Sequence, residues 1–293
     1  MAMFQNIKTL TISRRDNTYP ALLKEIHNPP DILYVKGKLG TEELCLAIVG
    51  SRKPTRYGLE ITEELVRGLA EQSDATIVSG LASGIDTAAH KAALKYGAQT
   101  IGVLGSGMDQ KSFFPQENIH LAEKIIEAGG AVISEYPNET PGLPHHFPER
   151  NRIIAGMSLG VIVVEAQERS GALITARIAL EENREVFAVP GPVYSLFSAG
   201  PNALIQRGAK LITSAEDILT ELNLPGQKNN NASQLHLSDP LEQKIMEQLD
   251  RECTIDDLYK KTNCSTADII TALSMLELKK LVTKIGRDTW IQK

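Results

Sequence analysis

Short apolar runs alternate with longer amphipathic stretches through the middle of the chain, from Leu46 to about Leu222. The runs are rich in β-branched residues and lack alternating polar positions, which is typical of strands that are buried on both faces. The stretches between them have the pattern of helices that cover a sheet. The pattern therefore predicts an α/β fold with a doubly wound, mostly parallel sheet. The runs expected to be strands are 46–49, 76–78, 100–104, 131–133, 160–164 and 185–189.

The segments on either side of this region have different patterns. The N-terminal part contains an apolar run at 31–35, which predicts a short helix and an extended piece packed on the main domain. A polar stretch with a Pro-Gly break predicts a linker. Beyond it, capping-box patterns at Thr254 and Ser265, followed by a hairpin pattern, predict a winged helix. The extension, main domain, linker and winged-helix-like domain are expected at 1–45, 46–223, 224–238 and 239–293.

Composition places the chain among ordinary globular proteins, with 42% hydrophobic and 23% charged residues. No apolar run approaches the roughly 20 residues of a membrane-spanning helix, and the N-terminus lacks a signal-peptide core. We therefore expect a cytoplasmic protein with no membrane partner. The three cysteines, Cys45, Cys253 and Cys264, lack the paired spacing of a zinc site. The net charge of -5 argues against a generally basic surface, so a polyanion must be bound by a local cluster of cations.

Small and hydroxyl residues dominate four loops that follow predicted strands of the main domain, at 50–53, 79–86, 105–107 and 165–172. In a doubly wound sheet, ligands bind outside the carboxyl ends of the strands. Backbone N–H groups of glycine-rich loops approach an anion closely, and hydroxyls add donors, so these loops predict a phosphate-binding site. The candidate residues are Gly50, Ser51, Arg52 and Lys53 after the first strand, and Ser79, Gly80, Ser83 and Gly84 after the second.

A predicted helix start within 144–157 carries an aromatic residue and two arginines. Pro148 suits the first helical position, so the free N–H groups that follow would point at a ligand. The apolar positions from Ile153 to Met157 are expected to face the core. Taken alone, the segment also fits an arginine-capped surface helix with a buried aromatic. Combined with the loop cations, it favours single-stranded nucleic acid, with Phe147 stacking on a base and Arg150, Asn151 and Arg152 as polar contacts.

Catalytic patterns do not assemble. The loop 50–54 is not G-x-G-x-x-G, the loop 105–107 lacks the third glycine, and there is no Walker lysine motif. Asp86 and His90 lie four residues apart at a predicted helix start and are close enough to touch, but such a pair is more often structural. The adjacent histidines 145–146 have no further metal ligands and are expected to line a groove. We therefore expect no enzyme activity, no metal and no cofactor.

These motifs, in this order, resemble the DNA-processing protein A family, also called DprA or Smf. The resemblance rests on 48–52, 79–86, 147–154, 163–166, 171–176, 189–191 and 200–205. It implies an extended Rossmann-like domain that binds single-stranded DNA and loads the RecA recombinase onto it in natural transformation. It also implies a homodimer, and single-strand-binding protein is a further expected partner. By position, the implied DNA pocket contains Gly50, Ser51, Arg52, Phe147, Arg150, Asn151 and Arg152.

Two departures from the family pattern affect these expectations. Some relatives carry a basic residue where this chain has Pro144, His145 and His146, and the N-terminal helical domain of longer relatives is missing or reduced. The winged-helix segment has nine Lys and Arg against ten Asp and Glu, a local net charge of 9 - 10 = -1. Its third predicted helix has no basic face before Lys279 and Lys280. A protein-contact or auxiliary role is therefore favoured over reading of duplex DNA.

Two further alternatives concern assembly and chemistry. An apolar stripe near the end of the main domain, formed by Ile212, Ile218, Leu219 and Leu222, is either the dimer interface or the packing face of the last helix.

A nucleotide-handling hydrolase of the phosphoribohydrolase type is the alternative function. It is disfavoured because 189–192 does not continue into that class's P-G-G-x-G-T pattern. A transcription regulator led by the winged helix is disfavoured by that segment's charge.

Overall fold

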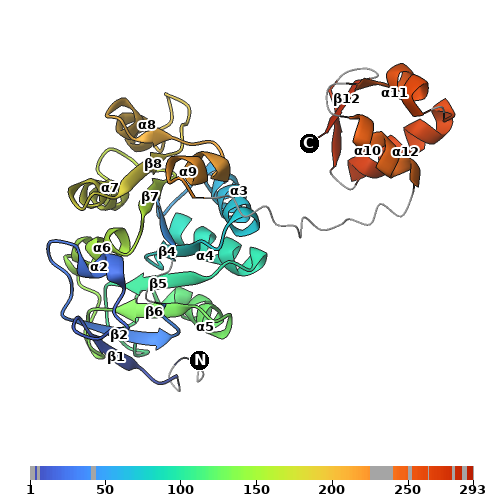
Figure 1. Ribbon diagram of the computed structural model, residues 1–293. Helices are drawn as coiled ribbons and strands as arrows, with labels where there is room; N and C mark the ends of the chain where they lie inside the picture. The colour runs from blue at the N-terminus through green and yellow to red at the C-terminus, as the bar shows by residue number, and fades with distance from the viewer. Residues whose placement is uncertain are drawn as a thin grey trace. The chain divides into compact units, whose positions relative to one another are not determined.

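The computed structural model describes residues 4, 7–40, 44–224, 240–249, 253–262, 264–278, 281–285 and 289–292. The chain divides into two compact units, Met1–Gln227 and Lys228–Lys293 (Figure 1). Apart from Leu224, the predicted linker lies outside the described residues, as do Lys279, Lys280 and the predicted turn at 286–288. Among the described residues, no helix combines the length and apolarity needed to cross a bilayer.

The first unit is built on a nine-stranded sheet with the order β1-β2-β6-β5-β4-β3-β7-β8-β9. The seven strands from β6 to β9 in this order are parallel, whereas β2 pairs antiparallel with β6 and with β1. The predicted doubly wound, mostly parallel sheet is confirmed. The strands are β1 (Leu10–Ser13), β2 (Ile32–Gly37), β3 (Cys45–Val49), β4 (Thr76–Ser79), β5 (Thr100–Leu104), β6 (Ala131–Ser134), β7 (Gly160–Val163), β8 (Glu185–Ala188) and β9 (Lys210–Leu211).

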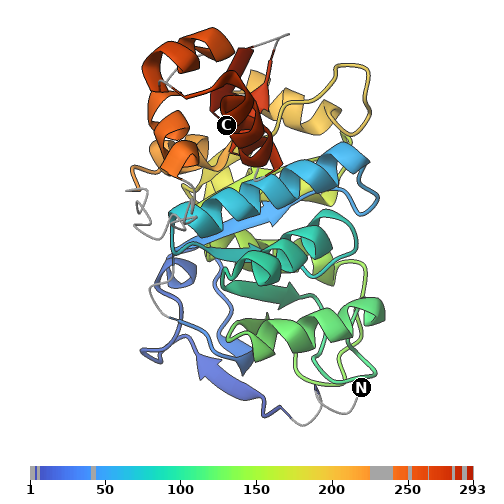
Figure 2. The ribbon, with the colours of Figure 1, turned by 90° about the vertical axis from the view of Figure 1, so that its right-hand side faces the viewer.

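Helices cover both faces of the sheet, and α3, α4 and α5 lie across the face turned to the viewer in Figure 2. Side chains of one strand alternate between the two cores, since Ala47 and Val49 pack on one face and Leu46 and Ile48 on the other. One face carries α2 (Ala21–Lys24), α6 (His146–Gly156), α7 (Gly171–Glu181) and α8 (Ala199–Gln206). The other carries α3 (Arg56–Gln72), α4 (Ile85–Tyr96), α5 (Ile119–Glu127) and α9 (Ala215–Glu221). Burial on both faces explains why the strand sequences are continuously apolar.

The N-terminal segment is more closely integrated than the predicted packing implies, because β1 and β2 are hydrogen-bonded strands of the main sheet. Tyr34 of β2 pairs with Ser134 of β6. The Tyr19 hydroxyl donates a 2.8 Å hydrogen bond to the Pro30 carbonyl and closes the connection between the two strands. Since β2 runs against β6, its first residue lies at the edge of the sheet where β6 ends.

The apolar stripe near the end of the main domain belongs to the core. Ile212, Ile218 and Leu219 are at most 3% exposed and pack with Leu65 and Leu69 of α3. Leu222 is half-buried against the same cluster. Ser214 and Asp217 form a capping box that fixes the start of α9. Of the two alternatives for this stripe, the structure shows packing of the last helix on the sheet for Ile212, Ile218 and Leu219, which leaves only Leu222 with surface for a contact.

The described residues of the second unit form three helices and a three-stranded sheet with the order β10-β12-β11. Asp257 N donates to Thr254 Oγ1, and Thr254 N donates to the Asp257 carboxylate, both at 3.2 Å, which confirms the predicted capping box. Asp268 N donates to Ser265 Oγ at the next helix start. The predicted winged helix is confirmed. Its elements are α10 (Pro240–Gln248), β10 (Cys253–Thr254), α11 (Ile255–Thr262), α12 (Thr266–Leu278), β11 (Val282–Lys284) and β12 (Thr289–Gln292).

Candidate functional site

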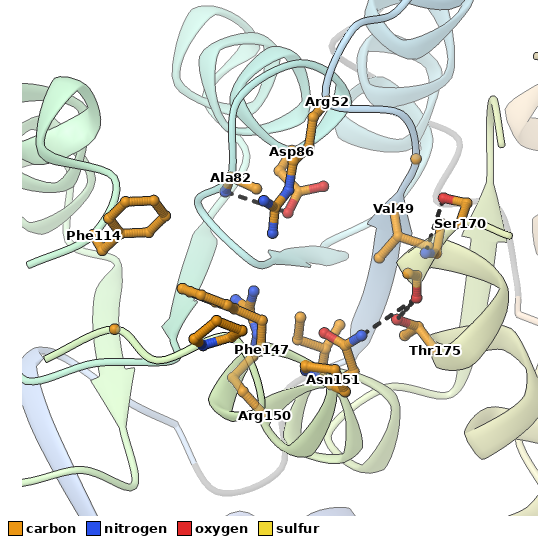
Figure 3. Close-up of a pocket in the computed structure, with 17 residues that line it drawn as sticks. Val49, Arg52, Ala82, Asp86, Phe114, Phe147, Arg150, Asn151, Ser170 and Thr175 are labelled. Atoms are coloured by element: carbon orange, nitrogen blue, oxygen red, sulfur yellow. Dashed lines mark hydrogen bonds between the residues drawn. The ribbon is translucent and has the colours of Figure 1, made fainter. Parts of the chain in front are cut away.

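A pocket of about 510 Å³ lies at the carboxyl ends of β3 and β7 (Figure 3). From β3 the chain order runs one way through β4 and β5, and from β7 it runs the other way through β8, so this is the switch point of the doubly wound sheet. The pocket's size suits one small ligand or one unit of a polymer. Its wall includes Val49, Gly50 and Arg52 at and beyond the end of β3, Ala82 and Asp86 after β4, Phe114, Gly142 and Pro144 from loops, Phe147, Pro148, Arg150, Asn151 and Ile154 on α6, and Ser170, Gly171, Ala172 and Thr175 at the start of α7.

Arg52 and two aromatic rings form the open side of the pocket. The guanidinium carbon of Arg52 lies 5.5 Å from the ring centroid of Phe147, and Figure 3 shows its side chain reaching from the loop after β3 toward α6. The rings of Phe147 and Phe114 are 5.4 Å apart and tilted by 47°. Arg52 is exposed, Phe114 is 45% exposed and Phe147 is half-buried. An exposed cation therefore stands beside a partly open aromatic surface, as the sequence predicted for Arg52 and Phe147.

The loop after β3 is held in place by the loop after β4. Gly84 has φ +82°, and a Cβ there would lie 2.3 Å from the Ser51 carbonyl oxygen, so only glycine fits. Ile85 N donates a 3.1 Å hydrogen bond to the same oxygen. The Ser51 hydroxyl accepts from Lys53 N at 3.1 Å and shapes the turn. Ser51, Lys53 and Gly84 thus position Arg52 and lie outside the pocket wall, although Lys53 is exposed beside it.

Arg150 is a buried brace at the back of the pocket. It is 4% exposed and donates to the Val103 carbonyl and, at 2.7 Å, to the Gly80 carbonyl, so it ties α6 to two strand ends. Burial lowers the pKa of Arg150 to about 10, which leaves it charged at neutral pH. A Cβ on Gly80 would lie 2.5 Å from the guanidinium and 2.7 Å from an oxygen of Asp86. Gly80 therefore serves the close packing of these two charged groups.

The other polar residues of α6 also bond within the protein. Asn151 Nδ2 donates to the Gly171 carbonyl at 3.3 Å and connects α6 to α7 across the pocket wall. Arg152 forms a 2.6 Å ion pair with Glu135 and lies outside the pocket wall. The helix begins at His146, so Pro148 is its third residue and the predicted first position is wrong by two residues. Of the predicted contacts on α6, Phe147, Arg150 and Asn151 line the pocket, and Arg152 lies outside its wall.

The His146 side chain is buried, whereas the sequence predicted that it would line a groove. It is 8% exposed, and its ring stacks on Tyr136 with centroids 4.1 Å apart. The Tyr136 hydroxyl donates to Glu149 at 3.0 Å. His145 remains exposed and contacts the His146 ring edge to face. The start of α6 is therefore anchored by aromatic packing, which holds Phe147 in place.

Asp86 and His90 bond to different partners, and no hydrogen bond joins them within the part of the chain that the structure describes. The Asp86 carboxylate accepts from Gly80 N at 3.0 Å and from Ala82 N at 3.4 Å, and burial raises its pKa. His90 is fully buried, its Nδ1 lies 2.7 Å from Thr100 Oγ1, and burial lowers its pKa to about 3. The imidazole of His90 is neutral and enclosed, and the carboxylate of Asp86 is bonded to backbone amides. Both side chains therefore have structural roles.

Two predicted hydroxyl donors point elsewhere. Ser79 is buried and donates to the Ile48 carbonyl at 2.6 Å, which couples β4 to β3. Ser83 donates to Glu117 at 2.6 Å and lies outside the pocket wall. Of the predicted loop residues, Gly50 and Arg52 line the pocket, and the others lie outside its wall.

The fold brings further groups to the site, some from the predicted loop 165–172 and one, Phe114, that the sequence did not single out. Ser170 caps α7 by accepting from Ala172 N at 3.3 Å, so the N-terminus of α7 faces the pocket beside Gly171. Phe114 supplies the second ring. Glu165 is 2% exposed and accepts from Thr55 N at 2.8 Å and from Thr55 Oγ1 at 2.5 Å, which anchors the start of α3 next to the Arg52 loop. The position of 165–172 directly after a predicted strand is the signal by which the sequence placed Ser170 and Gly171 among the candidate loops.

The fold and the pocket define a doubly wound domain with a cation and aromatic site at its switch point, followed by a winged helix. The family model described as DNA recombination-mediator protein A matches residues 10–223, and the DprA winged helix domain matches residues 230–285. The chain belongs to this DNA recombination-mediator family. The resemblance found in the motifs is thereby confirmed, and the family's role is in DNA processing.

Named relatives and solved structures agree with this assignment. DNA processing protein DprA of Bacillus subtilis is 46% identical over 220 residues, which is 74% of this chain and 72% of that protein. Protein Smf of Escherichia coli is 40% identical over 269 residues, 89% of this chain and 71% of that protein. The structure of DprA from Streptococcus pneumoniae has a TM-score of 0.68 at 44% identity and covers 75% of this chain and 76% of its own. DNA processing protein A of Helicobacter pylori, which is reported to have a single-stranded DNA binding mode, has a TM-score of 0.64 at 30% identity, covering 74% and 97%.

Proposed function

We propose that this protein binds single-stranded DNA in the switch-point pocket and acts as a recombination mediator. The observation that carries the proposal is the exposed Arg52 guanidinium beside the Phe147 and Phe114 rings. Base stacking on aromatic rings and charge contacts to phosphate are the two interactions that hold single strands without reading sequence. The N-terminus of α7 and the buried charge of Arg150 add a positive potential at the same place.

The shape of the site favours a single strand over a duplex. A base must leave its stack to lie against Phe147, and a base paired in B-form DNA is not free to do so. The backbone N–H groups at Gly50 and Gly171, which line the pocket, suit phosphate. Contacts to phosphate do not distinguish one base from another. We infer that binding is independent of sequence and weakens as salt rises.

We further propose that the bound strand is passed to the RecA recombinase in the cytoplasm, in the uptake of DNA during natural transformation. A homodimer would present the strand at two sites and raise the local concentration of the recombinase on it. The same strand would be taken over from single-strand-binding protein. Support comes from the family's role as a recombination mediator and from the names of the relatives.

Under this proposal the protein binds DNA and does not hydrolyse nucleotides. Asp86, the carboxylate in the pocket wall, is buried and accepts hydrogen bonds from two backbone amides, which favours a bracing role over acid-base catalysis.

We also propose that residues 1–223 form the DNA-binding part and that 239–293 act as an auxiliary protein-contact domain. Exposed apolar side chains on α12 support this, since Ile270 and Met275 are 46% and 44% exposed.

A direct comparison of strands tests the proposal. The full chain is titrated into a labelled oligothymidylate of about 20 nucleotides and into a matched blunt duplex, across a salt series, and anisotropy is recorded. We expect tighter binding to the single strand and a negative slope of log affinity against log salt. Equal affinity for the duplex, or affinity indifferent to salt, would contradict the proposal.

A further inference from the structure

The loop 190–198, between β8 and α8, exposes three large apolar side chains at its tip. Val193, Tyr194 and Leu196 are 82%, 98% and 72% exposed. Exposed apolar groups in a cluster mark contact surfaces more often than isolated ones do. The pocket wall does not include them.

The tip is held on a firmly bonded base. Asn202 Nδ2 donates to the Gly191 carbonyl at 3.0 Å, and Gly191 N donates to Asn202 Oδ1 at 3.3 Å. On the other side, Ala166 N donates to the Phe197 carbonyl at 2.8 Å. Side chains on such a base are presented to a partner at a small further cost in ordering.

The same loop is joined to the wall of the pocket from two directions. The Tyr57 hydroxyl at the start of α3 donates to the Pro190 carbonyl at 2.8 Å. Ala166, bonded to the loop, precedes the segment that enters the pocket wall at Ser170. In Figure 2 the loop before α3, in blue, and the loop before α8, in golden yellow, both project from the right-hand side.

Exposed cations stand at the start of α3 and in the loop before it, next to Tyr57, which is bonded to the base of the tip. Arg52 belongs to the pocket, Lys53 is exposed beside it, and Arg56 opens α3 next to Tyr57. Arg56 pairs with Glu60, but both side chains are more than half exposed, so the pair is weak and available for exchange.

Exposed aromatic residues of the first unit gather at this edge of the sheet. Among its described residues, the large exposed aromatics are Tyr57, Phe114 and Tyr194. Phe114 lines the pocket, Tyr57 begins α3, and Tyr194 follows β8, so all three lie beyond the carboxyl ends of parallel strands. Aromatic residues interleaved with cations form the surface that a single strand follows.

We propose that the tip of loop 190–198 is a second DNA contact, with Tyr194 stacking on a base of the strand that leaves the pocket past Tyr57. This inference rests on the proposed function. Domains that bind single strands without reading sequence, such as OB-folds, contact about 4 to 16 nucleotides of the strand. The pocket of about 510 Å³ suits only one unit of such a polymer. The strand must therefore cross the neighbouring surface, and the cations and aromatics at the start of α3 lead it to Tyr194.

Strand length separates the two contacts. The full chain is titrated with an oligothymidylate of about 4 nucleotides, which fills the pocket, and with one of about 20 nucleotides, which reaches the tip. Tyr194→Ala should lower affinity for the long strand by roughly five-fold or more, the least expected for loss of one base stack, and Tyr194→Phe should restore it. The gain in affinity from the short to the long strand should shrink accordingly. Because Tyr194 is 98% exposed, the fold should tolerate both changes.

Other outcomes overturn the inference in distinguishable ways. Wild-type affinity of Tyr194→Ala for the long strand would exclude the second contact while leaving the pocket intact. If that variant instead sediments as a smaller species with its long-strand affinity unchanged, the tip is a protein contact. Phe147→Ala should weaken binding of both strands, and if it affects neither, the proposed function itself fails.

Discussion

The guanidinium of Arg52 stands 5.5 Å from the centre of the Phe147 ring, although 95 residues separate them in the sequence (147 - 52 = 95). The arginine comes from the loop after β3 and the phenylalanine from α6. A cation beside an aromatic face serves both parts of a nucleotide, because phosphate approaches the charge while the base stacks on the ring.

Arg52→Ala should weaken binding of single-stranded DNA by about 1.5–3 kcal/mol, the cost of one charge-assisted contact. The melting temperature should stay unchanged because Arg52 is exposed. Lys53→Ala, which removes the neighbouring exposed charge outside the pocket wall, is the matched control and should have the smaller effect. Normal binding by Arg52→Ala at an unchanged melting temperature would place the DNA elsewhere.

The two arginines of α6 should respond differently to removal. Arg150→Ala should destabilise the first unit by about 3 kcal/mol or more, because it removes the hydrogen bonds to two buried carbonyls and leaves Asp86 without its neighbouring charge. Arg152→Ala removes a partly exposed ion pair with Glu135 and should cost about 1 kcal/mol. Urea unfolding of both variants measures the difference. Equal midpoints would refute the bracing role of Arg150.

Much of the fold follows from the sequence because its signals are local. A continuously apolar strand reports that both faces are buried, and Leu46 and Ala47 do pack on opposite faces. The strand-end rule also located Gly50 and Arg52 at the pocket. The predictions that failed concern side chains whose partners are distant in the sequence. The burial of Arg150 is set by the carbonyls of Gly80 and Val103, which no spacing around α6 reveals.

The same limit applies to the remaining misses. Pairing of β2 with β6 joins residues about a hundred positions apart, so an extended pattern at 31–35 could not name its partner. Phe114 reaches the pocket through a loop without periodicity. Hydroxyls such as Ser79 look like ligand donors in a sequence, yet a carbonyl of the adjacent strand takes the bond.

His90 should make the first unit less stable in acid. Its folded pKa of about 3 lies below the ordinary 6.5, so the unfolded chain binds the proton more readily between these values. Stability from this group is present above pH 6.5 and is lost as pH falls, by about 2 kcal/mol on reaching about pH 5. Asp86, whose pKa is raised, has the opposite sign and loses its contribution as pH rises. His90→Gln should flatten the acid side of the stability curve measured by urea unfolding, and an unchanged slope would exclude His90 as its cause.

Removal of residues 226–293 should leave single-strand binding within a few-fold of the full chain. The pocket is formed entirely by the first unit, and the winged-helix segment carries no net positive charge to attract DNA. Anisotropy with the truncated protein measures this, and Arg52→Ala in the truncated background is the control. A truncated protein that folds, by circular dichroism, but no longer binds the strand would place the site in the winged helix.

Mediation should require no nucleotide hydrolysis by this protein. The groups at the pocket bind and brace, so exchange must draw on the recombinase's own ATP and on mass action from a strand held at raised local concentration. Purified protein is mixed with RecA and a single strand coated with single-strand-binding protein, and filament growth is followed by fluorescence. We expect faster growth than with RecA alone, and a reduced gain with Arg52→Ala because less strand is held. Absence of acceleration, or ATP hydrolysis by this protein without RecA, would refute the mediator role, whereas acceleration retained by Arg52→Ala would separate it from the pocket.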